Sequence, residues 1–115
     1  MKLVKEIQEW FKTQCDGEWE HEHGLTIRSL DNPGWVVQIS LENTKLESKP
    51  FEIVNQNVSS EFVDQAMGKV KTPFQCASPL SEDWILCFVQ NKTFEGAGGA
   101  ESLGRILEAF VRWAK

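Results

Sequence analysis

Ten consecutive residues near the N-terminus have the composition of a reactive site: CDGEWEHEHG, at positions 15–24, combines one thiol, four acidic residues and two histidines. If this segment is extended, His21 and His23 share one face and could bind a metal ion, with an acidic residue as third ligand. Structural zinc sites have four ligands and commonly use CxxC pairs, which this sequence lacks, and HEH differs from the helical HExxH of metalloproteases. We therefore favour a solvated, charged connection between two elements, and predict no metal and no other cofactor.

Three cysteines, Cys15, Cys76 and Cys87, are the candidates for thiol chemistry. A phosphatase-like or sulfur-transfer loop places an arginine after the cysteine, often as CxxxxxR, whereas Cys76 is followed by ASPLSED. Acidic residues also follow Cys15, and negative charge raises the pKa of a thiol and suppresses the reactive thiolate. Cys87 lies in the apolar run WILCFV, where we expect a core residue. None of the three has the surroundings of an activated nucleophile.

A third candidate is the glycine-rich stretch GAGG, residues 96–99, which precedes a helical pattern. A helix N-terminus behind glycines can bind phosphate. No GK[ST] follows these glycines, so the phosphate-binding interpretation is weak. We interpret them as a tight turn between a strand and the last helix.

Paired carboxylates are the fourth candidate, among them Glu20 with Glu22 and Glu82 with Asp83. General acid–base catalysis needs one acid that is desolvated beside a cleft, and a sequence alone does not show this. Most such pairs lie on the solvated surface, where they can complement a basic partner. We therefore assign no catalytic residue and predict that the protein is not an enzyme.

The elements that position these residues follow from hydrophobic periodicity. Apolar residues at three- and four-residue spacing predict amphipathic helices over residues 2–15 and 100–114. Alternating apolar residues over 25–28 and 35–41, on either side of the turn sequence NPGW, predict an antiparallel hairpin. The segment CDGEWEHEHG is then the junction from the first helix to the first strand.

Two further strands complete the predicted sheet. Residues 51–54 form the third strand, and residues 83–90, which are apolar on both faces, form a central one. Between them, Ser59 could cap a short helix that is followed by an irregular, proline-containing stretch. Sequential strands with helices at both ends predict an α+β fold: an antiparallel sheet of about four strands flanked by N-terminal and C-terminal helices, in a single domain over residues 1–115.

The amino-acid composition and net charge limit the kinds of partner that this protein can bind. The chain has 115 residues, 41% hydrophobic and 25% charged, which is typical of one globular domain. No apolar run approaches the ~18 residues that span a bilayer. The charged N-terminus MKLVKEIQEWFK also lacks the apolar region of a signal peptide, so we expect a cytoplasmic protein that does not bind membranes. The net charge of −5 disfavours direct nucleic-acid binding and favours a basic protein partner.

Several stretches taken together resemble the immunity protein 53 family: EWFKTQCDGEWEHEHG, LDNPGW, DWILCFVQNKTFEGAGG and LGRILEAFVRW. The resemblance covers residues 7–54 and 83–113, and its most specific parts are LDNPGW and CDG-WEH. It implies a small bacterial antitoxin of a polymorphic toxin system, which binds a cognate protein toxin and blocks it. A basic nuclease is one class of toxin that would suit this charge.

Charge and expected exposure select seven candidate partner-binding residues. They are Trp19, Glu20, His21, Glu22, Glu82, Asp83 and Glu95. The leading hypothesis is an immunity protein that acts by steric and electrostatic blockade. The alternatives are a small metal- or thiol-dependent enzyme and a subunit or adaptor of a larger assembly.

Overall fold

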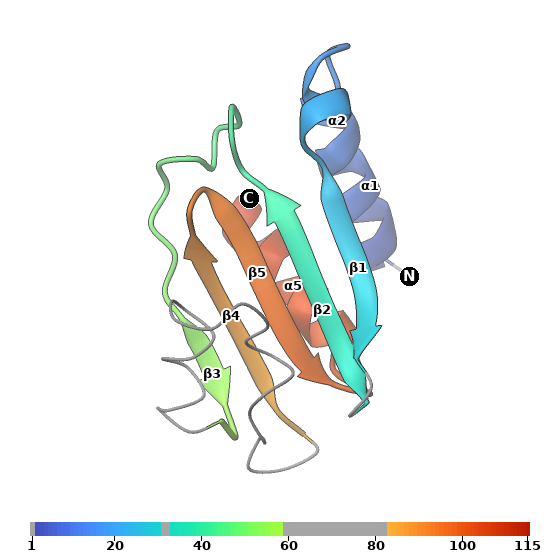
Figure 1. Cartoon of the computed structure of the whole chain (residues 1–115), viewed down its shortest axis with the longest axis vertical. Coiled ribbons are helices and arrows are strands. Elements are labelled where there is room, and N and C mark those ends of the chain that lie inside the picture. Colours follow the sequence, from blue (N-terminus) through green and yellow to red (C-terminus); the bar gives the residue numbers. More distant parts are fainter. Residues whose placement is uncertain (1, 31–32, 59–82) are drawn as a thin grey trace.

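The computed structural model describes residues 2–30, 33–58 and 83–115. Its elements are, in chain order, α1 (Lys2–Gln14), α2 (Trp19–Glu22), β1 (Leu25–Leu30), β2 (Gly34–Ser40), β3 (Val54–Gln56), β4 (Ile85–Gln90), β5 (Thr93–Gly99) and α5 (Leu103–Ala114). The strands form one antiparallel sheet in the order β1-β2-β5-β4-β3 (Figure 1). This confirms the predicted α+β fold, with five strands where the sequence indicated about four.

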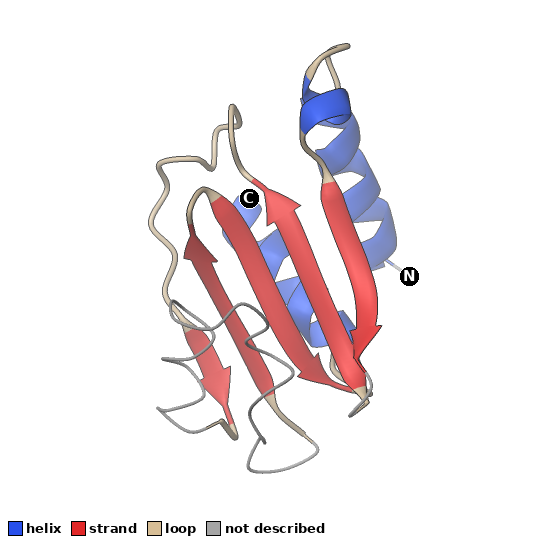
Figure 2. Cartoon of the chain, in the orientation of Figure 1, coloured by secondary structure: helices blue, strands red, loops and turns tan. Residues whose placement is uncertain are grey.

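Both long helices lie on the same face of the sheet, with α5 behind the central strands and α1 behind β1 (Figure 2). Between the helices and the sheet lies the main core, whose fully buried members include Val37, Ile39, Phe94, Ile106 and Phe110. These side chains come from β2, β5 and α5, so the C-terminal helix is part of the core. Burial of each such side chain stabilises the fold by roughly 1.5–3 kcal/mol.

The opposite face of the sheet carries a second buried cluster. Its members are Leu30, Val36, Trp84, Leu86, Phe88 and Ala97. Because side chains alternate between faces along a strand, β4 supplies Leu86 and Phe88 to this cluster and Ile85 and Cys87 to the main core. The prediction of a central strand buried on both sides is therefore confirmed for β4.

The glycine-rich stretch is part of a strand, so its interpretation as a strand-to-helix turn is wrong. Gly96 and Gly98 lie within β5 on the face that α5 covers. A Cβ atom on Gly96 would lie 2.4 Å from Cγ2 of Ile106, and one on Gly98 would lie 2.7 Å from Cβ of Ser102. The glycines therefore allow the helix to approach the central strand closely, and the turn into α5 begins only after Gly99.

Two other predictions differ in detail or fall outside the described residues. The third strand begins at Val54, so its prediction at residues 51–54 was misplaced. Phe51 instead lies in the preceding connection, where its ring contacts those of Phe94 and Trp113 edge-on at centroid distances of 5.5 and 5.1 Å. The helix predicted after Ser59 lies outside the described residues. Within those residues, no helix has the length and apolar character needed to cross a membrane.

The close approach of α5 to β5 predicts opposite effects for two glycine substitutions. Gly96→Ala should destabilise the protein by ~1–3 kcal/mol, because the new methyl group meets the stiff, fully buried side chain of Ile106. Gly104→Ala is the matched control: apart from the adjoining backbone of α5, no described atom lies within 4 Å of its Cβ position, so it should be neutral or stabilise by up to ~1 kcal/mol. Chemical denaturation measures both, and equal stability of the Gly96→Ala and wild-type proteins would show that α5 can move away.

Candidate functional site

The segment CDGEWEHEHG forms a compact corner built around the short helix α2, so the extended conformation that would place His21 and His23 on one face is not adopted. The Asp16 carboxylate accepts hydrogen bonds from the backbone N–H groups of Glu18 and Trp19, both at 2.9 Å. The Glu20 carboxylate accepts in return from the backbone N–H groups of Asp16 and Gly17, at 3.0 and 2.9 Å. This reciprocal arrangement satisfies N–H groups that a helix start leaves without partners, as a capping box does. Two of the four acidic residues in the corner are therefore structural.

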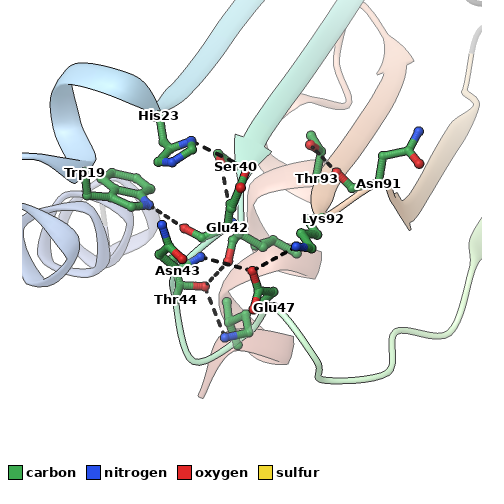
Figure 3. Close-up of polar contacts among 12 residues, drawn as sticks. Trp19, His23, Ser40, Glu42, Asn43, Thr44, Glu47, Asn91, Lys92 and Thr93 are labelled. Atoms are coloured by element: carbon green, nitrogen blue, oxygen red, sulfur yellow. Dashed lines mark hydrogen bonds and ion pairs between the residues drawn. The ribbon is translucent and has the colours of Figure 1, made fainter.

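Trp19 lies inside the molecule, which corrects the expectation that it is exposed. Its side chain is 4% exposed, and its indole ring contacts the rings of Trp10 and Phe11 on α1 at 6.0 and 5.9 Å. The indole Nε1–H donates a 2.8 Å hydrogen bond to the backbone carbonyl of Glu42 (Figure 3). Trp19 thus fixes α2 against α1 and against the segment that follows β2.

The segment after β2 brings a further carboxylate to this corner. His23 Nδ1 lies 3.9 Å from Oε2 of Glu42 (Figure 3). The Glu47 carboxylate accepts from the backbone N–H of Asn43 at 3.3 Å and lies 3.5 Å from Nζ of Lys92. Lys92 therefore offsets Glu47, whereas Glu42 faces the histidine and adds its charge to those of α2.

We call the carboxylates of Asp16, Glu18, Glu20, Glu22 and Glu42 the acidic end of the molecule. In Figure 1 it lies at the top, where β1 begins and β2 ends. The pKa of Asp16 is lowered, mainly by a hydrogen bond from the backbone N–H of Trp19. The pKa of Glu20 is also lowered, mainly by its own backbone N–H. Partial desolvation opposes both shifts. Both residues therefore stay ionised at neutral pH, and they keep their charge while they hold the corner together.

Beside the acidic end is an open pocket of about 390 Å³. It is lined by His23, Gly24, Leu25, Thr26, Gln38, Ser40 and Thr93. Thr26 and Gln38 pair across β1 and β2, on the sheet face opposite the helices, and Gln38 Nε2–H donates to Oε1 of Glu95 at 3.0 Å. The pocket is mostly polar, with hydroxyl, amide and imidazole groups that suit hydrogen bonding to a polar or basic side chain.

The structure brings together some of the predicted contact residues and separates others. Glu20, His21 and Glu22 share the corner around α2, and Glu95 lies beside the pocket through its bond to Gln38. Asp83 lies at the other end of the sheet, before β4, where its Oδ1 accepts a 2.6 Å hydrogen bond from Nη1 of Arg105. Glu82 is outside the described residues.

Two further residues of the site, Glu42 and His23, were not among the predicted contacts. The sequence near Glu42, ENTKLESKP, reads only as a polar connection. His23 had a signal in the motif, but its partner is nineteen positions away in the chain. The tertiary structure supplies that proximity through the antiparallel pairing of β1 and β2.

The described thiols lack the features of nucleophiles. Burial raises the pKa of the Cys87 thiol to about 12, which fits its predicted place in the core. Partial desolvation, followed by the charges of Glu20 and Asp16, raises the pKa of Cys15. Cys76 lies outside the described residues. Within the described ranges, no group of three or more His, Cys, Asp or Glu residues is arranged to hold a metal ion.

Comparison with known proteins gives one family. A family model described as Immunity protein 53 matches residues 4–115, which is nearly the whole chain. No curated protein and no solved structure matches the sequence.

The corner around α2 predicts a pH dependence of stability. The folded-state pKa values of Asp16 and Glu20 lie below their ordinary values of 3.8 and 4.5, so the folded protein binds fewer protons than the unfolded chain in this range. Their stabilisation is present above those ordinary values and is lost as the pH falls through the lower folded-state values. Asp16→Ala should therefore lower the melting temperature at pH 7, with a difference from wild type that shrinks in acid.

The matched control for this prediction is Glu18→Ala. It removes a neighbouring exposed carboxylate and leaves the four backbone hydrogen bonds in place. Thermal unfolding followed by circular dichroism compares both variants with wild type across pH. If Asp16→Ala and Glu18→Ala gave the same profile, the capping role of Asp16 would be wrong.

Proposed function

The chain belongs to the immunity protein 53 family, and from this premise we propose that it binds a cognate bacterial toxin and neutralises it by steric and electrostatic blockade. The family match over residues 4–115 is the observation that carries the proposal. The partner is a protein toxin, and we place the encounter in the cytoplasm, where a toxin that attacks the cell's own machinery must be stopped. The protein acts in this scheme by occupying a surface and catalyses no reaction.

The acidic end is the surface we assign to the toxin. Segment 16–22 contains four acidic residues and no lysine or arginine, and Glu42 adds a fifth carboxylate across the corner. Such a concentration of negative charge attracts a basic protein and speeds its capture, because the electrostatic field steers the encounter. A basic nuclease is the class of toxin that suits this surface, since it must carry positive charge to bind nucleic acid.

The corner also has the rigidity that a tight binding surface needs. Trp19 anchors α2 from below, and the carboxylates of Asp16 and Glu20 are held by backbone N–H groups. The exposed His21 and Glu22 side chains therefore project from a fixed helical turn. Groups held in place before binding lose less conformational entropy when the partner docks, which favours affinity.

This assignment divides the seven candidate residues by role. Glu20, His21 and Glu22 are proposed to meet the toxin together with Glu42, and Glu95 is proposed to contribute through the neighbouring pocket. Trp19 acts from beneath as a positioning residue. Asp83 is at the opposite end of the sheet beside Arg105, where local charge is balanced, so we place it outside the contact surface.

Two charge reversals test the assigned surface. Glu22→Lys and Glu101→Lys each change the net charge by the same amount, but Glu101 follows β5 at the end of the sheet away from α2. We expect Glu22→Lys to slow association with the toxin by roughly 2- to 10-fold at low salt, and the loss should diminish at high salt. Glu101→Lys should slow association less, because its charge lies roughly 20 Å from α2 across the length of the strands, a distance at which about 0.1 M salt already screens it. Stopped-flow mixing with the product of the adjacent gene measures both rates.

Different outcomes contradict different parts of the proposal. If both reversals slowed association equally, the acidic end would not be the contact surface, although neutralisation itself could stand. If the adjacent product were not toxic, and co-expression of this protein protected cells from nothing, the immunity function would be wrong.

A further inference from the structure

The outer edge of β1 exposes backbone groups in a defined pattern. Among the described residues, β1 pairs with β2 alone. The N–H of Ser40 donates to the carbonyl of Gly24 at 2.9 Å, which fixes the alternation of the antiparallel ladder. Residues 24, 26, 28 and 30 therefore bond to β2, whereas Leu25, Ile27 and Ser29 direct their N–H and C=O groups away from the sheet. An extended chain could pair with these three residues.

Within the described residues, this edge has little of the usual protection against pairing. Natural edge strands are commonly short or carry lysine, proline or a bulge. β1 has six residues in unbroken register, with Arg28 as its one charged residue. At its centre Ile27 is 41% exposed, so an apolar side chain and outward-directed backbone groups coincide at one residue. No described residue pairs with this outer edge, which could therefore accept an added strand.

The helix behind β1 extends the apolar character of this side. Val4 on α1 is 47% exposed and shares a flank with Phe11, because seven residues make nearly two helical turns. The opposite flank faces α5, since Glu6 lies 3.1 Å from Nζ of Lys115. The Val4 flank therefore points away from α5, and α1 itself lies on the side of the molecule where β1 forms the edge (Figure 1).

We propose that a second copy of this chain adds to the outer edge of β1 about a two-fold axis at Ile27, so that the two five-stranded sheets become one continuous sheet. The inference rests on the edge alone and is independent of the proposed toxin.

The register follows from self-complementarity. A two-fold axis at Ile27 places Ile27 beside its equivalent and pairs Leu25 with Ser29 of the second copy, so every outward N–H and C=O of these residues meets a partner. Arg28 then lies opposite Thr26 of the second copy. An axis at Arg28 would set two positive charges opposite each other, and within β1 it would pair only Ile27 with Ser29 of the second copy, so Leu25 would have no partner in that strand. The charges and the number of backbone hydrogen bonds within β1 therefore both favour the axis at Ile27.

The acidic surface does not oppose this arrangement, although each copy has a net charge of −5. The two β1 strands run antiparallel, so the α2 corners lie at opposite ends of the strand pair. Six residues of strand span roughly 20 Å, which is about twice the Debye length at physiological salt. The repulsion between the two acidic ends is therefore largely screened, and the Val4 flanks of the two α1 helices lie on the same face of the joined sheet.

Sedimentation velocity on the full chain tests the proposal. We expect the wild-type protein to form a dimer as concentration rises. Ile27→Lys should abolish this dimer, because the two-fold axis would place two ammonium groups side by side. Ile53→Lys is the matched control: Ile53 is equally exposed, at 46%, but precedes β3 at the other edge of the sheet, so this variant should still dimerise. A wild-type monomer at all concentrations, or the same loss in both variants, would overturn the proposal.

Two further measurements keep the outcome clear if Ile27→Lys is poorly folded. Hydrogen exchange by NMR on the wild type should show amides 25, 27 and 29 becoming protected as the dimer forms, while amides 26 and 28 are protected throughout. Thr26→Glu, placed opposite Arg28 of the second copy, should strengthen the dimer by roughly 2- to 30-fold across its two symmetric pairs, and Thr26→Lys should weaken it. Rapid exchange of the odd-numbered amides in the dimer, or the reverse order of the two Thr26 variants, would contradict this interface.

Discussion

The fold depends on the close approach of α5 to the central strand β5. This strand has β2 on one side and β4 on the other, and its helix-facing glycines leave the space that Ile106 and Ser102 occupy. Larger residues there would hold the helix away from the sheet and open the core that Phe94 and Phe110 share. With α5 in place, α1 can pack beside it through contacts such as that of Trp10 with Phe110.

The proposed toxin-binding surface is a consequence of how the first helix is joined to the sheet. Trp19 fills the space between α1 and the end of β2, and it turns the chain so that the neighbouring carboxylates face solvent. The apolar anchor and the acidic rim therefore come from one short segment. Two of its carboxylates, those of Asp16 and Glu20, stabilise the corner through backbone hydrogen bonds. These bonds also hold the two charges in fixed positions, where a partner can meet them.

The acidic end and the β1 edge are adjacent in sequence but distinct in chemistry. The first offers charge that is effective over several ångströms and suits rapid capture of a basic protein. The second offers directional backbone groups and an exposed isoleucine, which suit a partner held at contact distance. Because α2 immediately precedes β1, antiparallel pairing along the edge would leave the two sets of carboxylates at opposite ends of the paired β1 strands.

The sequence by itself determined the two long helices, the hairpin, the doubly buried strand β4 and the family, because these depend on periodicity and local motifs that extend over many residues. It misjudged the GAGG stretch, since glycine disfavours strands locally and only the packing of α5 shows why β5 needs it. It also missed α2, because a four-residue helix is too short for a periodic signal. Tertiary structure alone decided that Trp19 is buried and that Glu42 joins the acidic end, since both result from contacts between segments about twenty residues apart.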